Sequence, residues 1–366
     1  MVILMKKRIQ HIFRQIKEDV DGIMVANSTK PHVDMTFYYA TGLIHGEFEG
    51  NAVLLNPDGS GEILTSFLEE ESARKSKLPV TVYTSAEERE NWLKERLDGM
   101  DNIGINPPEL TYRAYGMIKK FTKGKLIDVS EGIATARNIK DEDEIQRLRE
   151  AGRIASKVAD EMPDIIQEGM KEFQVAAEIS YAMKKLGASG DAFEIISSSG
   201  LNTAEPHYTS GERVIGQGDF VLLDFGAHYK RYCSDITRTF VMGEASEKQE
   251  RMYHTVLKAQ EAALEVIEPG VKGKDVHEAA ASVIDDTEFK GRFIHGLGHS
   301  IGLSVHDGSG LSPNVDIVLK PGMVFTVEPG VYLPGYGGVR IEDDIVVTEE
   351  GYELLTDARK DELKII

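Results

Sequence analysis

The chain has 366 residues, a length that allows two domains, each with a hydrophobic core of its own. Its 61 acidic residues outnumber 42 basic ones, and the net charge of -19 argues against nucleic acid and anionic membranes as partners. The single cysteine, Cys233, excludes an internal disulfide and is typical of a reducing compartment. No segment has the pattern of a signal peptide or a membrane span, so we expect a cytoplasmic protein.

Residues 1–128 carry the signals of a mixed α/β domain. An amphipathic helix opens the chain, with Ile9, Ile12 and Ile16 on one apolar stripe. A hairpin is expected between residues 52 and 64, around the turn sequence Asn-Pro-Asp-Gly. Further strands are expected at three apolar segments, GIMVA (22–26), VTVY (80–83) and NIGIN (102–106). Alternating helices and strands of this kind predict a mixed α/β fold.

Residues 129–366 are expected to form a second domain. The boundary lies at DVSEGIATARNIK (128–140), beyond which a charged amphipathic helix begins at Asp141. Further helices are predicted at 173–187, 246–267 and 273–286. The last two separate two acidic, strand-like segments, and they should pack on the outside of a sheet.

The first acidic segment is VLLDFGAHYKRYCSDITRTF (221–240). Asp224 and Asp235 lie symmetrically about a midpoint between Tyr229 and Lys230. A symmetric antiparallel hairpin would therefore place the two aspartates directly opposite each other, with Cβ atoms about 5 Å apart.

The second acidic segment is VFTVEPGVYLPGYGGVRIEDDIVV (324–347). Glu328 and Glu342 are symmetric about Gly335, which lies in the turn sequence Pro-Gly-Tyr-Gly-Gly. This pair is also expected to face across two strands.

Paired carboxylates on apolar strands are unfavourable unless a cation compensates them. Carboxylate oxygens with one or two imidazoles suit Mn, Co, Zn or Fe(II), and four carboxylates exceed what one such ion requires. Two divalent ions about 3.5 to 4 Å apart fit the number of ligands better. The alternative, that these are solvated acids in an acid-rich chain, is the weaker interpretation for two symmetric pairs on apolar strands.

A fifth ligand is expected from FIHGLGHSIGLSVHD (293–307). Its glycines allow the backbone to approach a site, and His295, His299 and His306 project from it. A lone histidine is more often an ordinary hydrogen-bonded group, but three in one short segment indicate a site. His299 is the preferred ligand, although the spacing alone does not decide among the three.

Four segments together resemble a known enzyme family. LLDFGAHYKRYCSDITRTF, HGLGHSIGLSVHD, TVEPGVY and GVRIEDD occur in the order and at the spacing of the pita-bread metallopeptidases, in the branch of Xaa-Pro dipeptidase (prolidase) and aminopeptidase P. The resemblance extends from about residue 130 to the end. It implies an α/β protein of two domains: a creatinase-like mixed α/β N-terminal domain (1–128) and a pita-bread catalytic domain (129–366) with a curved antiparallel sheet and outer helices. It also implies a homodimer, because the N-terminal domain of that branch caps the site and contributes to oligomers.

The resemblance implies five metal ligands, which are Asp224, Asp235, His299, Glu328 and Glu342. Asp235 and Glu342 would bridge two divalent ions (Mn, Co, Fe or Zn). All five residues are present, unlike in metal-free relatives such as creatinase and the histone-chaperone domains. A peptide bond would then be hydrolysed by a metal-bridged hydroxide, with Glu328 as the general base.

Three histidines and an arginine complete the catalytic candidates. His207 and His306 match family histidines that contact substrate and stabilise the tetrahedral intermediate. His295 lies in the glycine-rich histidine segment. Arg340 is two residues before Glu342 and so on the same face of its strand, where it can orient the carboxylates or bind substrate. A surface arginine at a strand end is the open alternative.

The expected substrates are dipeptides or short peptides with proline at the second position. The segment HDGSGLSPN after Val305 lacks the arginine with which some archaeal-type prolidases hold the product carboxylate, so aminopeptidase P activity stays open. Methionine aminopeptidase is less favoured because it usually lacks a large N-terminal domain. A non-catalytic peptide-binding protein, or a metal-free hydrolase like creatinase, is disfavoured because no ligand is lost.

Overall fold

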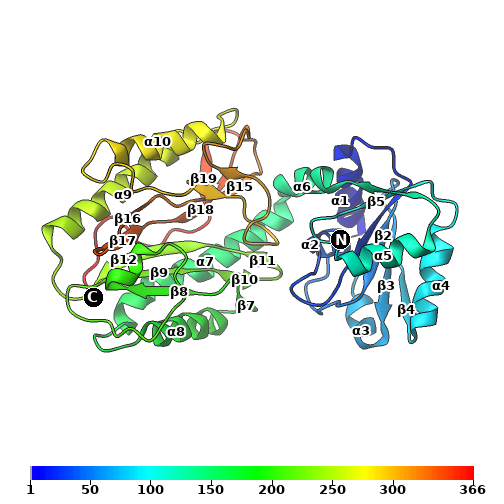
Figure 1. Cartoon of the computed structure of the whole chain (residues 1–366), viewed down its shortest axis with the longest axis horizontal. Helices are drawn as coiled ribbons and strands as arrows, with labels where there is room; N and C mark the ends of the chain where they lie inside the picture. Colours follow the sequence, from blue (N-terminus) through cyan, green and yellow to red (C-terminus); the bar gives the residue numbers. More distant parts are fainter. Residues whose placement is uncertain (1) are drawn as a thin grey trace. The chain divides into compact units, whose positions relative to one another are not determined.

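The computed structural model describes residues 2–366 and divides the chain into two compact units (Figure 1). The first unit ends at Arg137, and the second is Asn138–Ile366. The division falls within the segment 128–140, while the domain boundary after residue 128 stays a prediction. Between residues 2 and 366, no helix combines the length and the apolar character that crossing a bilayer requires.

The first unit begins with an amphipathic helix, as predicted. Its helices are α1 (Val2–Gln15), α2 (Met35–Thr41), α3 (Glu70–Ala73), α4 (Ala86–Leu97), α5 (Tyr112–Phe121) and α6 (Ser130–Asn138), in which the unit ends. Its strands are β1 (Gly22–Ala26), β2 (Ala52–Leu55), β3 (Gly61–Ser66), β4 (Val80–Tyr83), β5 (Asn102–Ile105) and β6 (Lys125–Asp128). The expected strands and the expected hairpin are thus confirmed.

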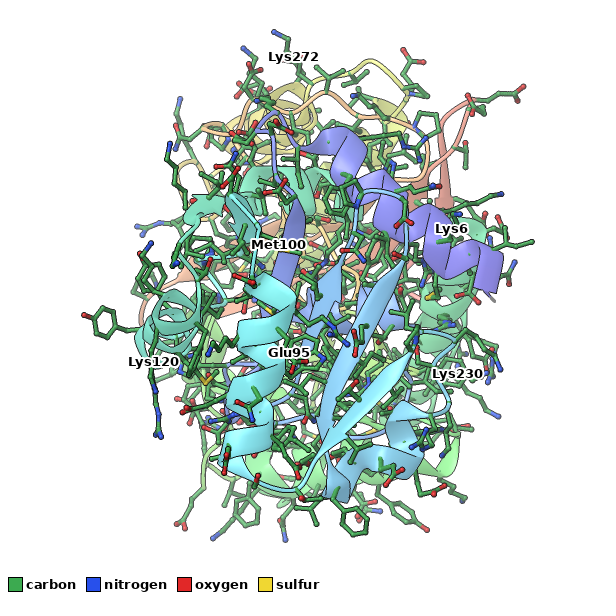
Figure 2. All side chains as sticks on the ribbon, turned by 90° about the vertical axis from the view of Figure 1, so that its right-hand side faces the viewer. Lys6, Glu95, Met100, Lys120, Lys230 and Lys272 are labelled. Atoms are coloured by element: carbon green, nitrogen blue, oxygen red, sulfur yellow. The ribbon has the colours of Figure 1, made fainter. Side chains whose placement is uncertain are left out.

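These strands form one mixed sheet in the order β4-β3-β2-β1-β5-β6. The pairs β1–β2 and β2–β3 are antiparallel and the other neighbours are parallel. Trp92 and Leu93 of α4 and Ile118 of α5 are buried in the cluster that includes the apolar side chains of the sheet. Exposed charges on the helices, such as Lys6 and Glu95, point outward (Figure 2).

The second unit contains the segments that carry every candidate site residue. Its helices are α7 (Glu142–Ile165), α8 (Glu172–Lys185), the 3-10 helix η2 (Gly200–Ala204), α9 (Glu247–Glu265) and α10 (Gly273–Asp285). Its strands are β7 (Gly190–Asp191), β8 (Ile196–Ser199), β9 (Phe220–Phe225), β10 (Ala227–Tyr229), β11 (Tyr232–Cys233), β12 (Ile236–Val241), β13 (Gly298–His299), β14 (Gly310–Leu311), β15 (Val324–Val327), β16 (Gly330–Leu333), β17 (Gly337–Arg340), β18 (Asp343–Val347) and β19 (Tyr352–Leu354). The four α-helices lie where the sequence predicts them.

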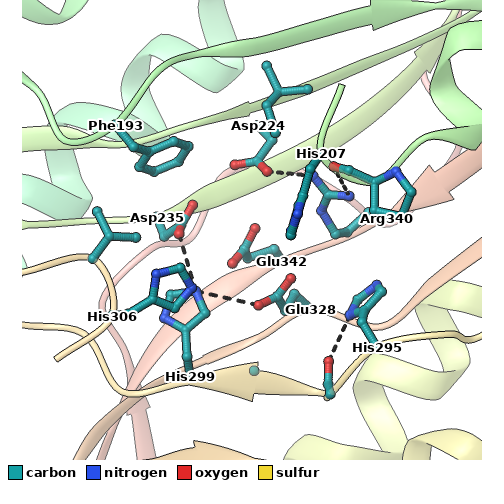
Figure 3. A pocket seen from close by; sticks show the side chains of 15 residues that line it. Phe193, His207, Asp224, Asp235, His295, His299, His306, Glu328, Arg340 and Glu342 are labelled. Carbon is teal, nitrogen blue, oxygen red and sulfur yellow. Dashed lines mark hydrogen bonds and ion pairs between the residues drawn. The ribbon is translucent and has the colours of Figure 1, made fainter. Parts of the chain in front are cut away.

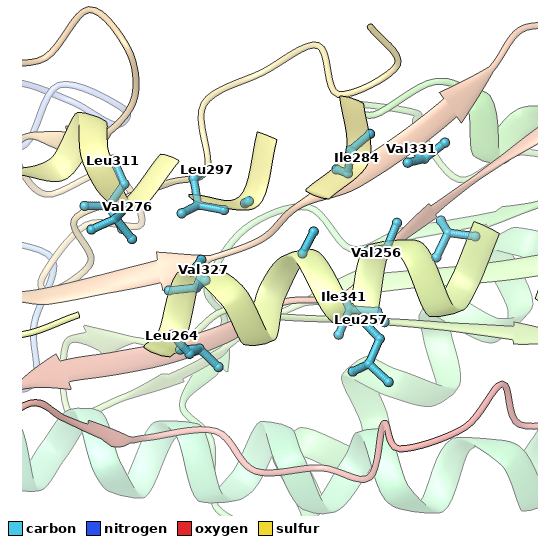
Figure 4. Packing of buried hydrophobic residues seen from close by; sticks show 14 of the residues in the cluster. Val256, Leu257, Leu264, Val276, Ile284, Leu297, Leu311, Val327, Val331 and Ile341 are labelled. Atoms are coloured by element: carbon cyan, nitrogen blue, oxygen red, sulfur yellow. The ribbon is translucent and has the colours of Figure 1, made fainter. Parts of the chain in front are cut away.

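Two antiparallel groups of strands, β12-β9-β8 and β15-β18-β19, are joined by a bridge between Thr237 and Glu342. Helices α9 and α10 pack against each other and against the second group through one apolar cluster (Figure 4). Val256 and Leu264 of α9 contribute to this cluster together with Val327 and Ile341. The acidic segments are therefore backed by a continuous core, which removes water from one side of the site.

The first acidic hairpin differs from its predicted register. Asp224 pairs with Thr237, and Asp235 lies two residues before that partner. The turn is formed by Lys230 and Arg231, with φ of 45° and 79°. Two central residues with positive φ match the twist of a two-residue hairpin, and they move the centre of symmetry one residue along the chain. The prediction that Asp224 directly opposes Asp235 is therefore wrong, and the two are diagonal neighbours.

The second acidic hairpin has the predicted register. Gly330 pairs with Arg340 on one side and Val327 pairs with Asp343 on the other, so Glu328 and Glu342 fall opposite each other between these two ladders. Gly335 lies at the turn with φ of 77°.

Helix α7 approaches the C-terminal segment closely at Gly152. A Cβ atom at this position would lie 2.1 Å from the carbonyl oxygen of Leu355. We expect Gly152→Ala to lower the free energy of unfolding by about 1–3 kcal/mol, because backbone must move to admit the methyl group. Gly116 of α5 has open space around it, so Gly116→Ala should instead stabilise by about 0.5–1 kcal/mol. Urea unfolding of both variants tests this difference in sign, and equal effects would contradict it.

Candidate metal centre

All of the predicted site residues line one cavity of about 340 Å³ in the second unit. They are His207, Asp224, Asp235, His295, His299, His306, Glu328, Arg340 and Glu342 (Figure 3). Phe193 and Ile196 form part of the apolar wall. Residues that are more than 130 positions apart in the sequence therefore meet in one place, although their roles remain predictions.

Each acidic residue is delivered by the end of a strand. Asp224 lies in β9, and Asp235 lies directly before β12. Glu328 and Glu342 occupy the break between the two ladders of the second hairpin. His299 belongs to β13, whose following residue bridges to β15.

Three of the predicted ligands form a compact cluster. Asp235, His299 and Glu342 each offer one ligand atom, and these atoms lie within 4.8 Å of one another. His299 Nε2 is 3.6 Å from Asp235 Oδ2 and 3.6 Å from Glu328 Oε1. One imidazole nitrogen thus faces several carboxylate oxygens, as it does in transition-metal sites.

The carboxylates of this cluster are buried close together and repel one another. Burial and the charges of Glu342 and Asp224 raise the pKa of Asp235 well above its usual value. Burial, then Glu328 and Asp224, raise the pKa of Glu342 in the same way. Burial also raises the pKa of Glu328 to about 8. Buried Oδ1 atoms of Asp224 and Asp235 have no hydrogen-bond partner. Divalent cations would relieve both the repulsion and the missing partners, so the donor set fits metal ions.

His299 is suited to bind a metal as a neutral ring. Burial, and to a smaller extent His306, lower the pKa of His299 to about 4. Its Nδ1 lies 3.4 Å from the carbonyl oxygen of Ser300, which can only accept a hydrogen bond. This contact favours a proton on Nδ1 and leaves the lone pair of Nε2 facing the carboxylates.

Arg340 is buried and forms an ion pair with Asp224, which excludes the surface-arginine alternative. Its Nη2 lies 2.5 Å from Asp224 Oδ2, and its Nε donates to Thr237 Oγ1. Burial opposes the charge, but Tyr332, Asp224 and Glu342 hold the pKa of Arg340 well above its usual value. The guanidinium thus fixes the orientation of Asp224 and leaves its other oxygen without a partner.

Tyr332 connects Arg340 to His295, and the sequence analysis missed it. Arg340 Nη1 donates to the Tyr332 hydroxyl over 2.8 Å, and this hydroxyl lies 3.0 Å from His295 Nε2. His295 Nδ1 contacts the Gly296 carbonyl at 2.8 Å, so the ring donates from Nδ1 and accepts from Tyr332. Burial and Arg340 lower the pKa of His295 to about 4. His295 is therefore a neutral part of a hydrogen-bonded chain beside the acidic cluster.

Two threonines that hold the acids were also missed. Thr237 Oγ1 donates to Glu342 Oε2 over 2.5 Å. Thr326 Oγ1 donates to Glu328 Oε1 over 3.1 Å and accepts from the backbone N–H of His299. Each threonine is two residues from an acid, so the two-residue period of a strand could have found both.

The two-residue period of a strand also explains why the consecutive acids at positions 342–344 differ in their surroundings. Asp344 points to the site side, where its Oδ2 accepts from the backbone N–H of Asp235. Asp343 points to the opposite side and forms an ion pair with Arg238 over 2.7 Å. Although burial opposes ionisation, Arg238 and Lys360 lower the pKa of Asp343. Asp343 is thus a charged structural group, in contrast to its two neighbours.

Two further histidines border the cluster. The ring centroids of His299 and His306 are 4.1 Å apart. His207 lies on the opposite rim, close enough to lower the pKa of both His295 and His306, after the larger effect of burial. The carbonyl of Pro206 accepts from Arg340 Nη1 at 3.4 Å, which links the His207 segment to β17.

A model of metallopeptidase family M24 matches residues 146–349, and a model of the creatinase/prolidase N-terminal domain matches residues 7–139. The chain belongs to metallopeptidase family M24. A protein named Xaa-Pro dipeptidase from Pyrococcus furiosus is 34% identical over 98% of this chain and 99% of its own length. The structure of an Xaa-Pro dipeptidase from Bacillus anthracis is 36% identical with a TM-score of 0.90, and covers all of both chains. The structure of an X-Pro aminopeptidase from Thermotoga maritima is 31% identical, with a TM-score of 0.89 over 97% of this chain and 99% of that one.

Membership of family M24 confirms the predicted fold and class. The chain has a creatinase-like N-terminal domain followed by a pita-bread catalytic domain. The protein is a metallopeptidase, and its family implies that it binds divalent metal.

Proposed function

We propose that this M24 metallopeptidase uses two divalent metal ions to hydrolyse the Xaa-Pro bond of dipeptides or short peptides. The observation that carries the proposal is a cavity lined by buried, mutually repelling carboxylates, two of which have an unpartnered oxygen, beside the neutral imidazole of His299. Solved and curated relatives named Xaa-Pro dipeptidase over nearly the full chain support the substrate class.

The proposed ligands are Asp224, Asp235, His299, Glu328 and Glu342. The compact cluster of Asp235, His299 and Glu342 supports one ion position. Asp224, with one oxygen on Arg340 and the other unpartnered, supports a second position beside it. Asp235 and Glu342 would bridge the two ions, because each lies close enough to both Asp224 and Glu328 for their charges to add to the effect of burial in raising its pKa.

Ions bound in this way would acidify a water molecule and polarise the scissile carbonyl. Glu328, held by Thr326, accepts the proton that the attacking water loses and passes it to the departing amine. His207 and His306 face the cavity from two segments and donate hydrogen bonds to the oxyanion that develops on the carbonyl oxygen. Arg340 keeps Asp224 oriented and, through Tyr332, fixes His295.

Removal of the first residue ahead of proline in longer peptides is the second candidate. It is supported by the structural similarity to an X-Pro aminopeptidase and by the absence of arginine from residues 306–314. A cytoplasmic homodimer belongs to the same proposal. Mn, Co, Fe and Zn all suit these ligands, and availability in the cell would choose among them.

Hydrolysis of three peptides separates the candidate specificities. Metal-stripped protein is assayed on Ala-Pro, Ala-Pro-Ala and Met-Ala-Ser before and after Mn or Co is added. We expect metal-dependent cleavage of Ala-Pro. Cleavage of Ala-Pro-Ala instead would indicate aminopeptidase P, and cleavage of Met-Ala-Ser would indicate methionine aminopeptidase. No cleavage of any peptide would contradict the proposal in favour of peptide binding without catalysis.

A further inference from the structure

A fully buried carboxylate lies at the base of the segment that carries His207. Glu172 is the first residue of α8 and has 0% of its surface exposed. Its Oε1 accepts from the backbone N–H of Ser199 over 2.7 Å and from the Ser199 hydroxyl over 2.8 Å. Its Oε2 accepts from the backbone N–H of Gly211 over 3.2 Å. One side chain thus holds both ends of residues 199–211.

Glu172 also binds inside this segment. The Asn202 side-chain amide donates to Glu172 Oε1 over 3.0 Å and to the Tyr208 hydroxyl over 2.8 Å. Tyr208 directly follows His207, and a hydrogen bond with Glu172 contributes, after burial, to raising its pKa. The carboxylate is therefore connected to the residue next to the proposed oxyanion donor.

The far side of the segment is fastened to β17. Thr203 Oγ1 donates to the Gly200 carbonyl and accepts from the backbone N–H of Gly338 over 2.7 Å. Arg340 reaches the carbonyl of Pro206. With its base on Glu172 and its tip on β17, the segment has few ways to move His207 relative to the acidic cluster.

This position requires a carboxylate. Its donors converge on both oxygens, and a carboxylate accepts at both without presenting a donor of its own. The N-terminus of α8 favours negative charge at the same place. A glutamine would turn its NH2 group toward one of the backbone N–H groups and leave that buried donor unsatisfied, which costs about 1–3 kcal/mol.

We infer that Glu172 is a positioning residue for the proposed reaction, because it clamps the ends of residues 199–211 and thereby holds His207 at the oxyanion. The inference rests on the proposed function. It assigns to Glu172 no contact with substrate or metal.

A double-mutant cycle with Glu172→Gln and His207→Ala tests the inference on the metal-loaded full chain. We expect Glu172→Gln to lower kcat/KM for Ala-Pro about tenfold, with bound metal per chain unchanged, because a misplaced group loses much of its effect. His207→Ala should lower kcat/KM about 10²-fold, as for loss of one oxyanion donor. The double variant should be no worse than His207→Ala. A double variant reduced by the product of the two single effects would overturn the inference, and so would an unchanged Glu172→Gln.

Two more variants keep the test decisive. Glu144→Gln removes another buried carboxylate, which accepts from Tyr232 and caps α7, and should lower thermal stability without changing kcat/KM. If Glu172→Gln is not recovered folded, Asn202→Ala removes one donor to the same carboxylate and should show the same non-additivity with His207→Ala. An additive Asn202→Ala effect would overturn the inference.

Amide hydrogen exchange gives a readout that needs no activity. In Glu172→Gln, the amides of Ser199 and Gly211 should exchange faster, whereas those of β9 should not change. Unchanged protection at both amides would overturn the clamp. Failure of the wild-type protein to cleave any peptide would instead overturn the proposed function, and the exchange result would still decide whether Glu172 holds the segment. If His207→Ala leaves kcat/KM unchanged, the positioning role of Glu172 is wrong, but the proposed metallopeptidase activity is not affected.

Discussion

Asp235→Asn is expected to abolish peptide hydrolysis and, at the same time, to leave the metal-free protein as stable as the wild type or more stable. Asp235 is buried among acids, and burial together with the charges of Glu342 and Asp224 raises its pKa. The amide keeps the shape and removes the charge, so the repulsion in the metal-free state falls. The variant also loses a proposed bridging ligand, so added metal should stabilise it much less than the wild type.

Thermal unfolding with and without Mn measures both effects of Asp235→Asn. Metal at a thousand times its Kd should stabilise the wild type by about 4 kcal/mol, and the variant by much less. The exposed Asp286 at the end of α10 provides the control, because Asp286→Asn should retain both activity and the Mn effect. Wild-type activity in Asp235→Asn would show that the bridging role is wrong.

Glu328→Gln is expected to lower kcat at least about 10³-fold, with a far smaller change in KM. The carboxylate faces the cavity beside His299 and is held by Thr326, which places it to accept a proton. General-base catalysis contributes about 10²–10⁴-fold, and the loss of a metal ligand adds to the effect. Steady-state kinetics at saturating Mn provide the measurement.

The matched control for Glu328→Gln is Glu350→Gln, at an exposed position after β18. It should leave kcat and KM unchanged. The metal content of both variants is measured in parallel. This measurement distinguishes activity that is lost with the proton acceptor from activity that is lost because an ion no longer binds. If Glu328→Gln turned over Ala-Pro at nearly the wild-type rate, another group would have to accept the proton.

The two acidic hairpins show how far local sequence predicts a site. The turn around Gly335 is marked by glycine and proline, so its centre and the facing of Glu328 and Glu342 were predictable. The turn of the first hairpin uses Lys230 and Arg231 at positive φ, which neither residue type signals. Its predicted centre was one residue off, and the direct pairing of the aspartates was wrong.

Long-range contacts explain what sequence could not predict. The helices and strands follow from periodicity and capping, as at Asp141, whose side chain caps α7 where the helix was expected to begin. Tyr332 joins Arg340 to His295, and Glu172 holds a segment that begins 27 residues later. Such partners are set by how strands and loops meet in space, and no local pattern in the chain marks them.

Counting bound metal while activity returns tests the central claim most directly. Wild-type protein is stripped of metal and assayed on Ala-Pro as Mn is added in steps, with bound Mn measured at each step. If the protein is a dinuclear Xaa-Pro peptidase, we expect no hydrolysis without metal and full hydrolysis once about two ions are bound per chain. Full hydrolysis by the metal-free protein, or no hydrolysis of Ala-Pro by protein that has bound two ions, would contradict it.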